Sequence, residues 1–357
     1  FLLVALRSPG MQAAFRESSS QTTNIANISL GRMRPLPFPI PPLAEQKRIV
    51  AKVDELMALC DRLEALQNQR KAARAVLTKE ILGRVASDAT VDAQTCLQNL
   101  SLLVSDVDQI PVLRQTILSL AVQGKLVRAH SIQRTMTKVR DPLLSTYALP
   151  ELPSHWQWAS LGRLATKMDS GWSPACLAEP AAIGQWGVLK TTSVQSMSFQ
   201  EEHNKALPSS LQPRPDSEVQ DGDILITRAG PANRVGICCV ARPKRDKLMI
   251  SDKIIRFHLI DDVEPDFAAL ALNAGYSNEV IESLKSGMAL SQVNISQPKL
   301  RSVPLPFPPL AEQKRIVAKV DELMALCDTL EAKLRKASQV QEQLAASSVA
   351  ALTGKAA

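Results

Sequence analysis

Two segments of the chain carry apolar residues at alternating spacings of four and three, which is the pattern of an a/d heptad stripe on a helix. The first stripe consists of Ile49, Val53, Leu56, Cys60 and Leu63. The second consists of Ile316, Val320, Leu323, Cys327, Leu330 and Leu334. Prolines directly before each segment cannot lie inside a helix and therefore indicate where it begins. The pattern predicts one helix from Leu43 to about Leu82, ended by Gly83, and another from Leu310 to about Leu344.

The two helical segments are copies of each other. Leu43–Asp61 reads LAEQKRIVAKVDELMALCD, and the same nineteen residues recur as Leu310–Asp328, 267 positions later. The match continues upstream, because Asn27-Ile28-Ser29 corresponds to Asn294-Ile295-Ser296 at the same offset. This period is far longer than that of a solenoid repeat and indicates a duplicated domain-plus-helix unit. Such a duplication permits a pseudo-two-fold arrangement that presents two similar surfaces in opposite orientations.

Two such stripes in one chain predict that the long helices pair as an antiparallel coiled coil. A further helix is predicted over Val107–Gln123, with Gly124 as its C-terminal stop, and its apolar residues are expected to pack on the pair. Without the flanking modules, an ordinary helical bundle with no spacer role would be the preferred interpretation of the stripes. A structural scaffold therefore remains an alternative at this point.

Between Glu151 and residue 308 the pattern changes to short apolar runs separated by glycine and proline turns. The predicted strands are Gly187–Thr192, Asp223–Arg228, Val235–Val240 and Lys253–Leu259. A helix is predicted over Asp266–Leu284. Strands with flanking helices are typical of a mixed α+β domain. The expected fold class is therefore α+β, with mixed domains joined by a long antiparallel two-helix coiled-coil spacer.

These patterns divide the chain into residues 1–42, 43–150, 151–308 and 309–357. The first part matches the end of the module at 151–308, since Phe1 and Ala5 fall opposite Phe267 and Ala271 at an offset of 266. The second and fourth parts hold the helices. The chain opens on Phe1 with an apolar run too short for a signal peptide, so we expect that the start of the first module lies upstream of an internal cut.

Composition narrows the functional classes. The chain has 357 residues, of which 45% are hydrophobic, and it contains no apolar run long enough to span a membrane. Its six cysteines form no C-x-x-C pair and its four histidines are scattered, so we expect no metal site and no cofactor. Reduced thiols favour a cytoplasmic protein.

Charge indicates a polyanionic partner. The net charge is +7, and the stretch from Ile224 to His258 holds eight Lys and Arg residues against two aspartates. The chain lacks phosphate-cradling glycine motifs and an Asn-Pro-Pro-aromatic run, so a catalytic role is not expected. An enzyme, either a nuclease or a methyltransferase, remains a third hypothesis beside a DNA reader and a scaffold.

Several motifs resemble the DNA-specificity subunits of type I restriction-modification enzymes. The run Pro304–Gln313, followed by a Lys/Arg-rich amphipathic helix, resembles their conserved region and occurs twice. Leu152-Pro153-x-x-Trp156-x-Trp158 resembles the start of their target-recognition domain, and Val188–Thr191 and Gly222–Leu225 resemble its internal landmarks. The resemblance covers essentially the whole chain, but the first recognition domain is present only as residues 1–42.

The resemblance implies a function and partners. Two recognition domains at opposite ends of a two-helix spacer would each read one half of a split site in double-stranded DNA, about one turn apart. DNA methyltransferase subunits and a motor-nuclease restriction subunit would supply the chemistry, so the chain itself is expected to be non-catalytic. A truncated chain is also expected to be able to rebuild the two-fold shape as a homodimer.

The candidate DNA contacts are polar and basic residues of the α+β module. Lys and Arg bind phosphates, and polar side chains that reach base edges discriminate by about 1–3 kcal/mol per bidentate pair. The candidates are Lys190, Thr191, Thr192, Arg228, Arg234, Lys253, Arg256 and Gln292. For each of them, the alternative is an ordinary surface or strand-end residue. The target bases depend on loop geometry and are not predicted.

Overall fold

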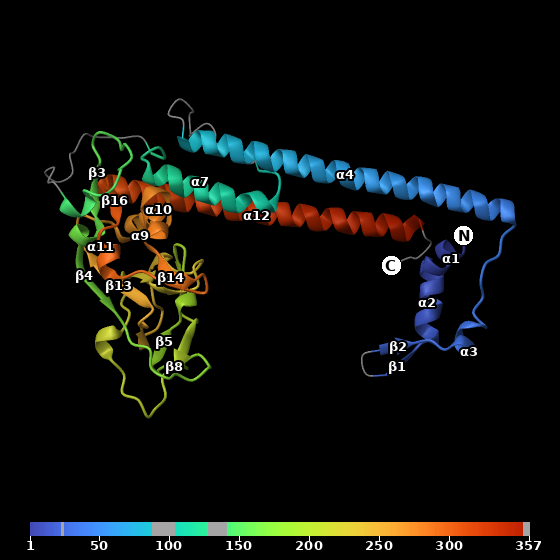
Figure 1. The fold of residues 1–357 in the computed structure, drawn as a ribbon, viewed down its shortest axis with the longest axis horizontal. Helices are drawn as coiled ribbons and strands as arrows, with labels where there is room; N and C mark the ends of the chain where they lie inside the picture. Colours follow the sequence, from blue (N-terminus) through green and yellow to red (C-terminus); the bar gives the residue numbers. More distant parts are fainter. Residues whose placement is uncertain (23–24, 88–103, 128–140, 353–357) are drawn as a thin grey trace. The chain divides into compact units, whose positions relative to one another are not determined.

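The computed structural model describes residues 1–22, 25–87, 104–127 and 141–352. Contacts divide the chain into two units, Phe1–Val76 and Leu77–Ala357, which are described separately. The elements of both units are labelled in Figure 1. Mixed strands and helices accompany two long helices, α4 (Leu43–Ser87) and α12 (Leu310–Leu352), so the predicted α+β class is confirmed.

The α+β module of the second unit is built on a four-stranded antiparallel sheet with the order β11-β9-β13-β4. These strands are Cys238–Val240, Ile224–Thr227, Ile254–Leu259 and Ala165–Ser170, respectively. Successive residues of a strand point to opposite faces. Ile224 and Ile226 therefore join the main core, while Leu225 joins a second buried cluster. Burial on both faces explains why this strand reads as a continuous apolar run.

Smaller sheets complete the module. Strands β12 (Leu248–Met249), β5 (Gly187–Leu189) and β8 (Asn204–Ala206) form one sheet, in which β12 and β5 are parallel. Strands β10 (Ala229–Gly230), β15 (Gln292–Asn294) and β14 (Ser286–Ala289) form another. The remaining pairs are β16 (Pro304–Phe307) with β3 (Gln157–Ser160), and β6 (Val194–Gln195) with β7 (Ser198–Phe199).

The main core lies between the four-stranded sheet and a group of helices. These are α7 (Ile110–Val122), α9 (Pro265–Asn273), α10 (Gly275–Leu284) and the first part of α12. Leu113, Phe257 and Phe267 are essentially fully buried there. The short helices α8 (Leu161–Leu164), α11 (Gln297–Arg301), η2 (Pro142–Leu144), η3 (Thr191–Ser193) and η4 (Pro215–Ser217) lie in the connections.

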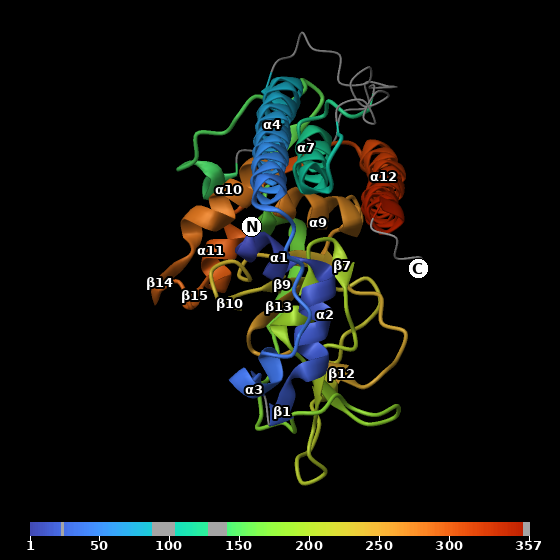
Figure 2. The same cartoon turned by 90° about the vertical axis from the view of Figure 1, so that its right-hand side faces the viewer.

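The stripe of α12 is the seam of this helical group. Ile316, Val320, Leu323 and Cys327 are each at most 3% exposed. Helix α7, which follows the 3-10 turn η1 (Val107–Gln109), and helix α9 pack against it, as the view nearly along the helices in Figure 2 shows. The expectation that the apolar face of α7 packs on a repeat helix is thus confirmed for α12.

The first unit repeats the element order of the end of the second. Its elements are α1 (Leu2–Arg7), α2 (Pro9–Ser18), β1 (Ser20–Thr22), β2 (Ile25–Asn27), α3 (Leu30–Met33) and α4. They parallel α9, α10, the β14–β15 hairpin, α11 and α12. A helix-start contact is repeated as well: Gln46 Nε2 donates to the Pro41 carbonyl at 2.8 Å, and Gln313 Nε2 donates to the Pro308 carbonyl at 2.8 Å.

Helix α4 exposes the stripe that α12 buries. Leu56 is 49% exposed, Leu63 is 53% exposed, and Cys60 is also exposed. The last part of α4, from Leu77 onward, belongs to the second unit. There Thr78 is buried, and its hydroxyl accepts a hydrogen bond from Gln109 Nε2 at 3.2 Å.

Some predicted boundaries are wrong. Helix α4 continues through Gly83 to Ser87, because a glycine inside a helix costs only about 1 kcal/mol of helix propensity. The helix predicted over Asp266–Leu284 is two helices, broken at Gly275, whose φ of +57° lies in the left-handed region. The strand predicted to reach Thr192 ends at Leu189 and is followed by the 3-10 turn η3.

Helix α12 likewise continues past the predicted end at Leu344 to Leu352. No helix in the described part of the chain is long and apolar enough to cross a membrane.

The two copies of the stripe allow a matched test of burial. We expect Leu323→Ala to lower the free energy of unfolding of its unit by about 2–5 kcal/mol, because it leaves a cavity in the seam. We expect Leu56→Ala, at the equivalent position of the first unit, to change the unfolding free energy of the second unit by about 0.5 kcal/mol or less, because Leu56 lies outside that unit. Urea denaturation of both variants of the whole chain measures the difference, and equal losses would contradict the assignment.

Candidate nucleic-acid interface

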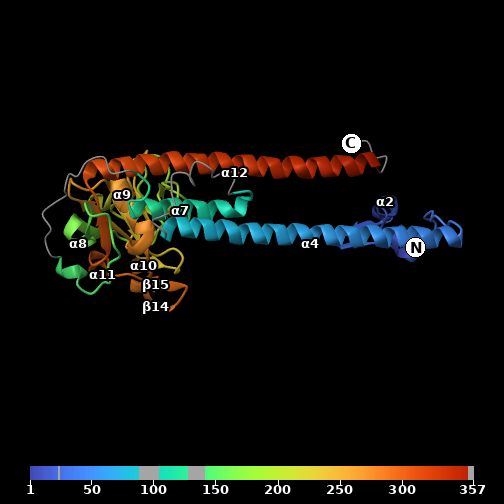
Figure 3. The same cartoon turned by 90° about the horizontal axis from the view of Figure 1, so that it is seen from above.

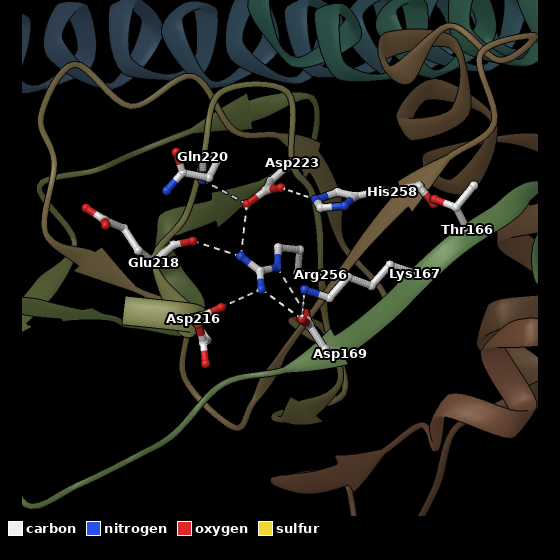
Figure 4. Close-up of polar contacts among 9 residues, drawn as sticks. All are labelled: Thr166, Lys167, Asp169, Asp216, Glu218, Gln220, Asp223, Arg256 and His258. Atoms are coloured by element: carbon white, nitrogen blue, oxygen red, sulfur yellow. Dashed lines mark hydrogen bonds and ion pairs between the residues drawn. The ribbon is translucent and has the colours of Figure 1, made fainter. Parts of the chain in front are cut away.

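Arg256 lies at the centre of a buried polar cluster (Figure 4). Its side chain is 4% exposed, and its Nε and Nη2 donate to the two carboxylate oxygens of Asp169 at 2.9 and 2.8 Å. Nη1 donates to the Glu218 carbonyl at 2.8 Å and to Asp223 Oδ2 at 3.4 Å, and Nη2 also donates to the Asp216 carbonyl. Every donor of this guanidinium is used inside the protein, so Arg256 is not available to contact DNA.

The contacts of the other residues in this cluster also indicate that it holds the fold together. Asp223, 2% exposed, also accepts hydrogen bonds from the Gln220 backbone at 2.8 Å and contacts His258 Nε2 at 2.5 Å. Burial raises the pKa of the Asp169 carboxyl, but hydrogen bonds from Arg256 and Lys167 outweigh this effect and hold its pKa below the ordinary value. The pair of Asp169 and Arg256 therefore stays ionised at neutral pH, and the cluster joins β4, β13 and the turn before β9.

Arg234 positions a neighbouring loop. Its Nη2 donates to the carbonyls of Thr191 and Val194 at 2.9 and 2.8 Å, and its Nη1 donates to Gln195 Oε1 at 2.9 Å. The Arg234 carbonyl accepts a hydrogen bond from the Thr227 hydroxyl. Arg234 thus ties the segment of Thr191 and Thr192 to the end of β9. Thr192 is left exposed at the surface.

Hydrogen bonds to the β14–β15 hairpin and from Lys285 also fix the loop that contains Arg234. The Ala232 amide donates to the Leu290 carbonyl at 2.8 Å, and Lys285 Nζ donates to the Ala232 carbonyl at 2.8 Å. Gly236 has a φ of +88°, and a Cβ at that position would lie 2.5 Å from Ile281 Cγ2, so this close approach requires glycine. Loop 228–236 is therefore a rigid platform between the hairpin β14–β15 and α10.

Arg228, at the start of this loop, is a half-buried arginine whose Nε, like that of Arg234, is buried without a hydrogen-bond partner among the described residues. No ion pair involving it is found among the described residues. Its backbone is well fixed, because its amide donates to the Lys253 carbonyl and its carbonyl accepts from the Ile295 amide, both at 2.8 Å. No side-chain hydrogen bond of Arg228 is found among the described residues either, and its Nη groups, unlike Nε, are not enclosed, so they can meet an acceptor from outside the chain.

The structure gathers most of the predicted contact residues around this loop. Lys253 is exposed beside Arg228, and Gln292 is exposed on β15, which pairs with the start of the loop through β10. Lys190 precedes the segment of Thr191 and Thr192 that Arg234 holds. Arg256 alone of the predicted set is enclosed by protein.

Sequence reasoning missed two residues of this surface. Asn233 is exposed at the tip of the loop, and Lys285 secures the loop from α10. The Gly-Pro-Ala-Asn run at 230–233 is a turn signal that could have indicated the first. Nothing in the sequence indicated the second, because Lys285 is more than fifty residues away from the carbonyl that it binds.

No group of three or more metal-ligating side chains occurs in the part of the chain that the structure describes. A small cavity of about 260 Å³ lies between loop 228–236 and α10. One of its lining amides, Asn273 Nδ2, already donates to the Cys238 and Ala269 carbonyls. The exposed surface of the loop, which includes Arg228 and Asn233 and lies beside Lys253, is therefore the candidate interface.

Known proteins resemble this chain over most of its length. The chain is 39% identical to the type I restriction enzyme EcoEI specificity subunit of Escherichia coli, over 97% of this chain and 63% of that protein. It is 26% identical to the EcoKI specificity subunit of E. coli K12, over 92% of this chain and 61% of that protein. The chain thus spans less than two thirds of the length of these relatives.

A solved structure, the HsdS subunit from Thermoanaerobacter tengcongensis, is 21% identical and covers 95% of this chain and 68% of that chain, with a TM-score of 0.46. The family model of the type I restriction modification DNA specificity domain matches residues 10–72 and 192–338. Because this match covers more than half of the chain, we conclude that the chain belongs to the family of type I restriction modification DNA specificity domains.

Proposed function

We propose that this chain reads DNA sequence for a type I restriction-modification complex and directs the catalytic subunits to their target without performing chemistry itself. Family membership supports this function. The observation that leads from the family to a site is Arg228, a half-buried arginine on a rigid loop whose guanidinium makes no hydrogen bond among the described residues, whereas Arg234 uses both Nη groups within the protein. Double-stranded DNA offers the missing acceptors, either phosphate oxygens or the O6 and N7 atoms of guanine.

Different residues of this surface would contact the phosphates and the bases of DNA. Lys253 and Lys190 would bind phosphates and set the register, while Arg228, Thr191, Thr192 and Gln292 would reach base edges. Arg234 acts differently from our sequence prediction, because three of its N–H groups hold the Thr191–Gln195 segment. It is a positioning residue that presents the exposed Thr192. A preorganised loop of this kind improves discrimination, since little order is lost on binding.

The duplication supports a domain assignment. We assign residues 151–308 to a complete target-recognition domain and residues 1–42 to the C-terminal remnant of another one. The helical parts, 43–150 and 309–357, would form an antiparallel spacer that sets the distance between two half-sites. The repeated order of helix, helix, hairpin, helix and long helix in the two units supports this assignment.

The proposed partners follow from the family. DNA methyltransferase subunits would carry out adenine chemistry, and a restriction subunit would supply the motor and nuclease activities. A homodimer and a cytoplasmic location stay predictions. A scaffold that assembles partners without reading DNA is the second candidate, and the exposed stripe of α4 is the observation that favours it.

The role of Arg228 in DNA binding can be tested by mutation. We expect Arg228→Ala to weaken binding of the specific DNA by about tenfold to one hundredfold, in proportion to about 1–3 kcal/mol for one good base contact. The control is Arg242→Ala, which removes an exposed arginine that pairs with Asp266. Gel shifts of the chain with its methyltransferase partner and competitor DNA measure both variants. A pure scaffold would give no sequence-specific band, and equal effects of the two variants would contradict the assignment.

The domain assignment predicts the outcome of an exchange. Replacing residues 151–308 with the corresponding module of another specificity subunit should change one half of the methylated site and leave the other half unchanged. Mapping the methylated adenines in DNA modified by the complex measures this. Methylation at identical sites after the exchange would show that the module does not read DNA.

The absence of chemistry in the chain is also testable. The purified chain alone should neither cleave DNA with magnesium nor transfer a methyl group from S-adenosylmethionine. The chain together with the methyltransferase subunit should methylate the DNA. Turnover by the chain alone, retained after a second chromatographic step, would favour the enzyme hypothesis.

A further inference from the structure

The hairpin of β14 and β15 carries an exposed apolar residue at its tip. It projects from the module on the side away from α12, as Figures 2 and 3 show. Leu290, in the turn of this hairpin, is 82% exposed. Its carbonyl accepts a hydrogen bond from the Ala232 amide at 2.8 Å, so the tip lies directly beside loop 228–236. An apolar side chain thus forms part of a surface that is otherwise polar and basic.

The backbone of the hairpin is closely fixed. A Cβ at Gly287 would lie 2.3 Å from the Gln292 carbonyl oxygen, so only glycine lets the two strands approach this closely. The register there is irregular, between Ser286 and Ala289. On the inner face, Val293 is buried in the main core, and β15 also pairs with β10. The tip is therefore preorganised, and little order would be lost when it meets a ligand.

The hairpin carries no charge of its own. Residues 286–296 contain no Asp, Glu, Lys or Arg. Affinity for the phosphate backbone comes mainly from Lys and Arg, and these stand at the base of the hairpin instead. The Arg228 carbonyl accepts from the Ile295 amide, and the Arg228 amide donates to the Lys253 carbonyl, both at 2.8 Å. An uncharged projection with cations at its base suits contact with bases better than contact with phosphates.

The duplication points to the same part of the hairpin. Its ends are identical in the two copies, because Ser286 and Asn294–Ser296 match Ser19 and Asn27–Ser29 at the offset of 267. The seven residues between these ends, 287–293, differ from residues 20–26 at every position, and both copies are uncharged. Leu290 corresponds to Thr23. A hairpin that keeps its ends and changes its tip is expected where each copy meets a different base sequence.

We propose that the β14–β15 hairpin enters the major groove of DNA and that Leu290 packs on the C5-methyl group of a thymine. This inference rests on the proposed function and adds the identity of one base in the half-site that residues 151–308 would read. The major groove admits a two-stranded β-ribbon, and thymine is the base that presents a methyl group there. Contact between this methyl group and the leucine removes apolar surface of both from water.

The minor groove is the less suitable place for this hairpin. Apolar wedges that separate base steps act there, but the groove is only about 6 Å wide. Two paired strands lie about 4.8 Å apart before their side chains are counted. The ribbon therefore fits the major groove, which is about 12 Å wide.

The experiment removes a single methyl group from the DNA. Once methylation mapping has given the target, each thymine of the half-site assigned to residues 151–308, on either strand, is replaced in turn by deoxyuridine. Fluorescence anisotropy of labelled duplexes with the chain and its methyltransferase partner measures the affinities. We expect one thymine whose replacement weakens binding about fourfold, the factor that burial of one methyl-sized group contributes.

Variants connect this effect to the leucine. Leu290→Ala should bind the thymine and deoxyuridine duplexes equally, whereas Leu290→Met, which keeps the apolar volume, should retain the preference for thymine. The control is Ile183→Ala, since Ile183 is 96% exposed in the loop before β5 and should not affect the preference. All three residues replaced are surface positions, so the thermal unfolding of the variants should match that of the unchanged chain.

Three outcomes would overturn the proposal. They are a half-site without thymine, the lack of any thymine whose replacement weakens binding, and a deoxyuridine effect that persists in Leu290→Ala. An equal loss of affinity for all duplexes in Leu290→Ala, with the thymine preference kept, belongs to the third case and would indicate a wedge. Failure of the proposed function is distinguishable, because the complex would then show no sequence-specific binding to any duplex.

Discussion

Burial of one apolar stripe on α12 holds the second unit together. The stripe packs under α7 and α9, which come from parts of the chain far apart in sequence. Burial of each leucine or isoleucine of the seam contributes about 1.5–3 kcal/mol, so the four innermost residues outweigh any single polar contact nearby. The pair between Arg114 and Asp328, 214 residues apart, adds orientation more than energy, since the aspartate is 70% exposed. The module is thereby fixed to the first part of α12, and the proposed DNA-contact loop keeps a fixed position relative to that part of the helix.

Two arginines, one in β13 and one directly after β9, differ in whether the protein itself uses their hydrogen-bond donors. Arg256 donates all of its hydrogen bonds within the protein, to carboxylates and carbonyls that hold the sheet edge together. Arg228, directly after the neighbouring strand β9, makes no side-chain hydrogen bond among the described residues. A saturated cation cannot gain by meeting DNA, whereas an unsaturated one can. Charge counting along the sequence cannot separate the two, because both contribute equally to a basic stretch.

Local patterns predicted the elements well, and tertiary contacts account for what they missed. The 4-3 spacing and the prolines located both long helices, and the Ile224–Ile226 run located the central strand. The break at Gly275 was not predictable, because it depends on Val122 of α7, whose Cγ2 would lie 2.6 Å from a Cβ there. The enclosure of Arg256 was hidden for the same reason. Its partners Asp169 and Asp223 lie 87 and 33 residues away in the chain.

The repeated nineteen residues separate what a sequence determines locally from what its surroundings determine. Both copies begin their helix after two prolines and repeat the contact of Gln46 with Pro41 as that of Gln313 with Pro308. Secondary structure is therefore set within the copied segment. Burial is not, because Leu323 and Leu56 occupy equivalent positions and differ in exposure by their neighbours alone. A duplicated segment carries its helix with it, but its stripe becomes a core only where a second element brings a complementary face.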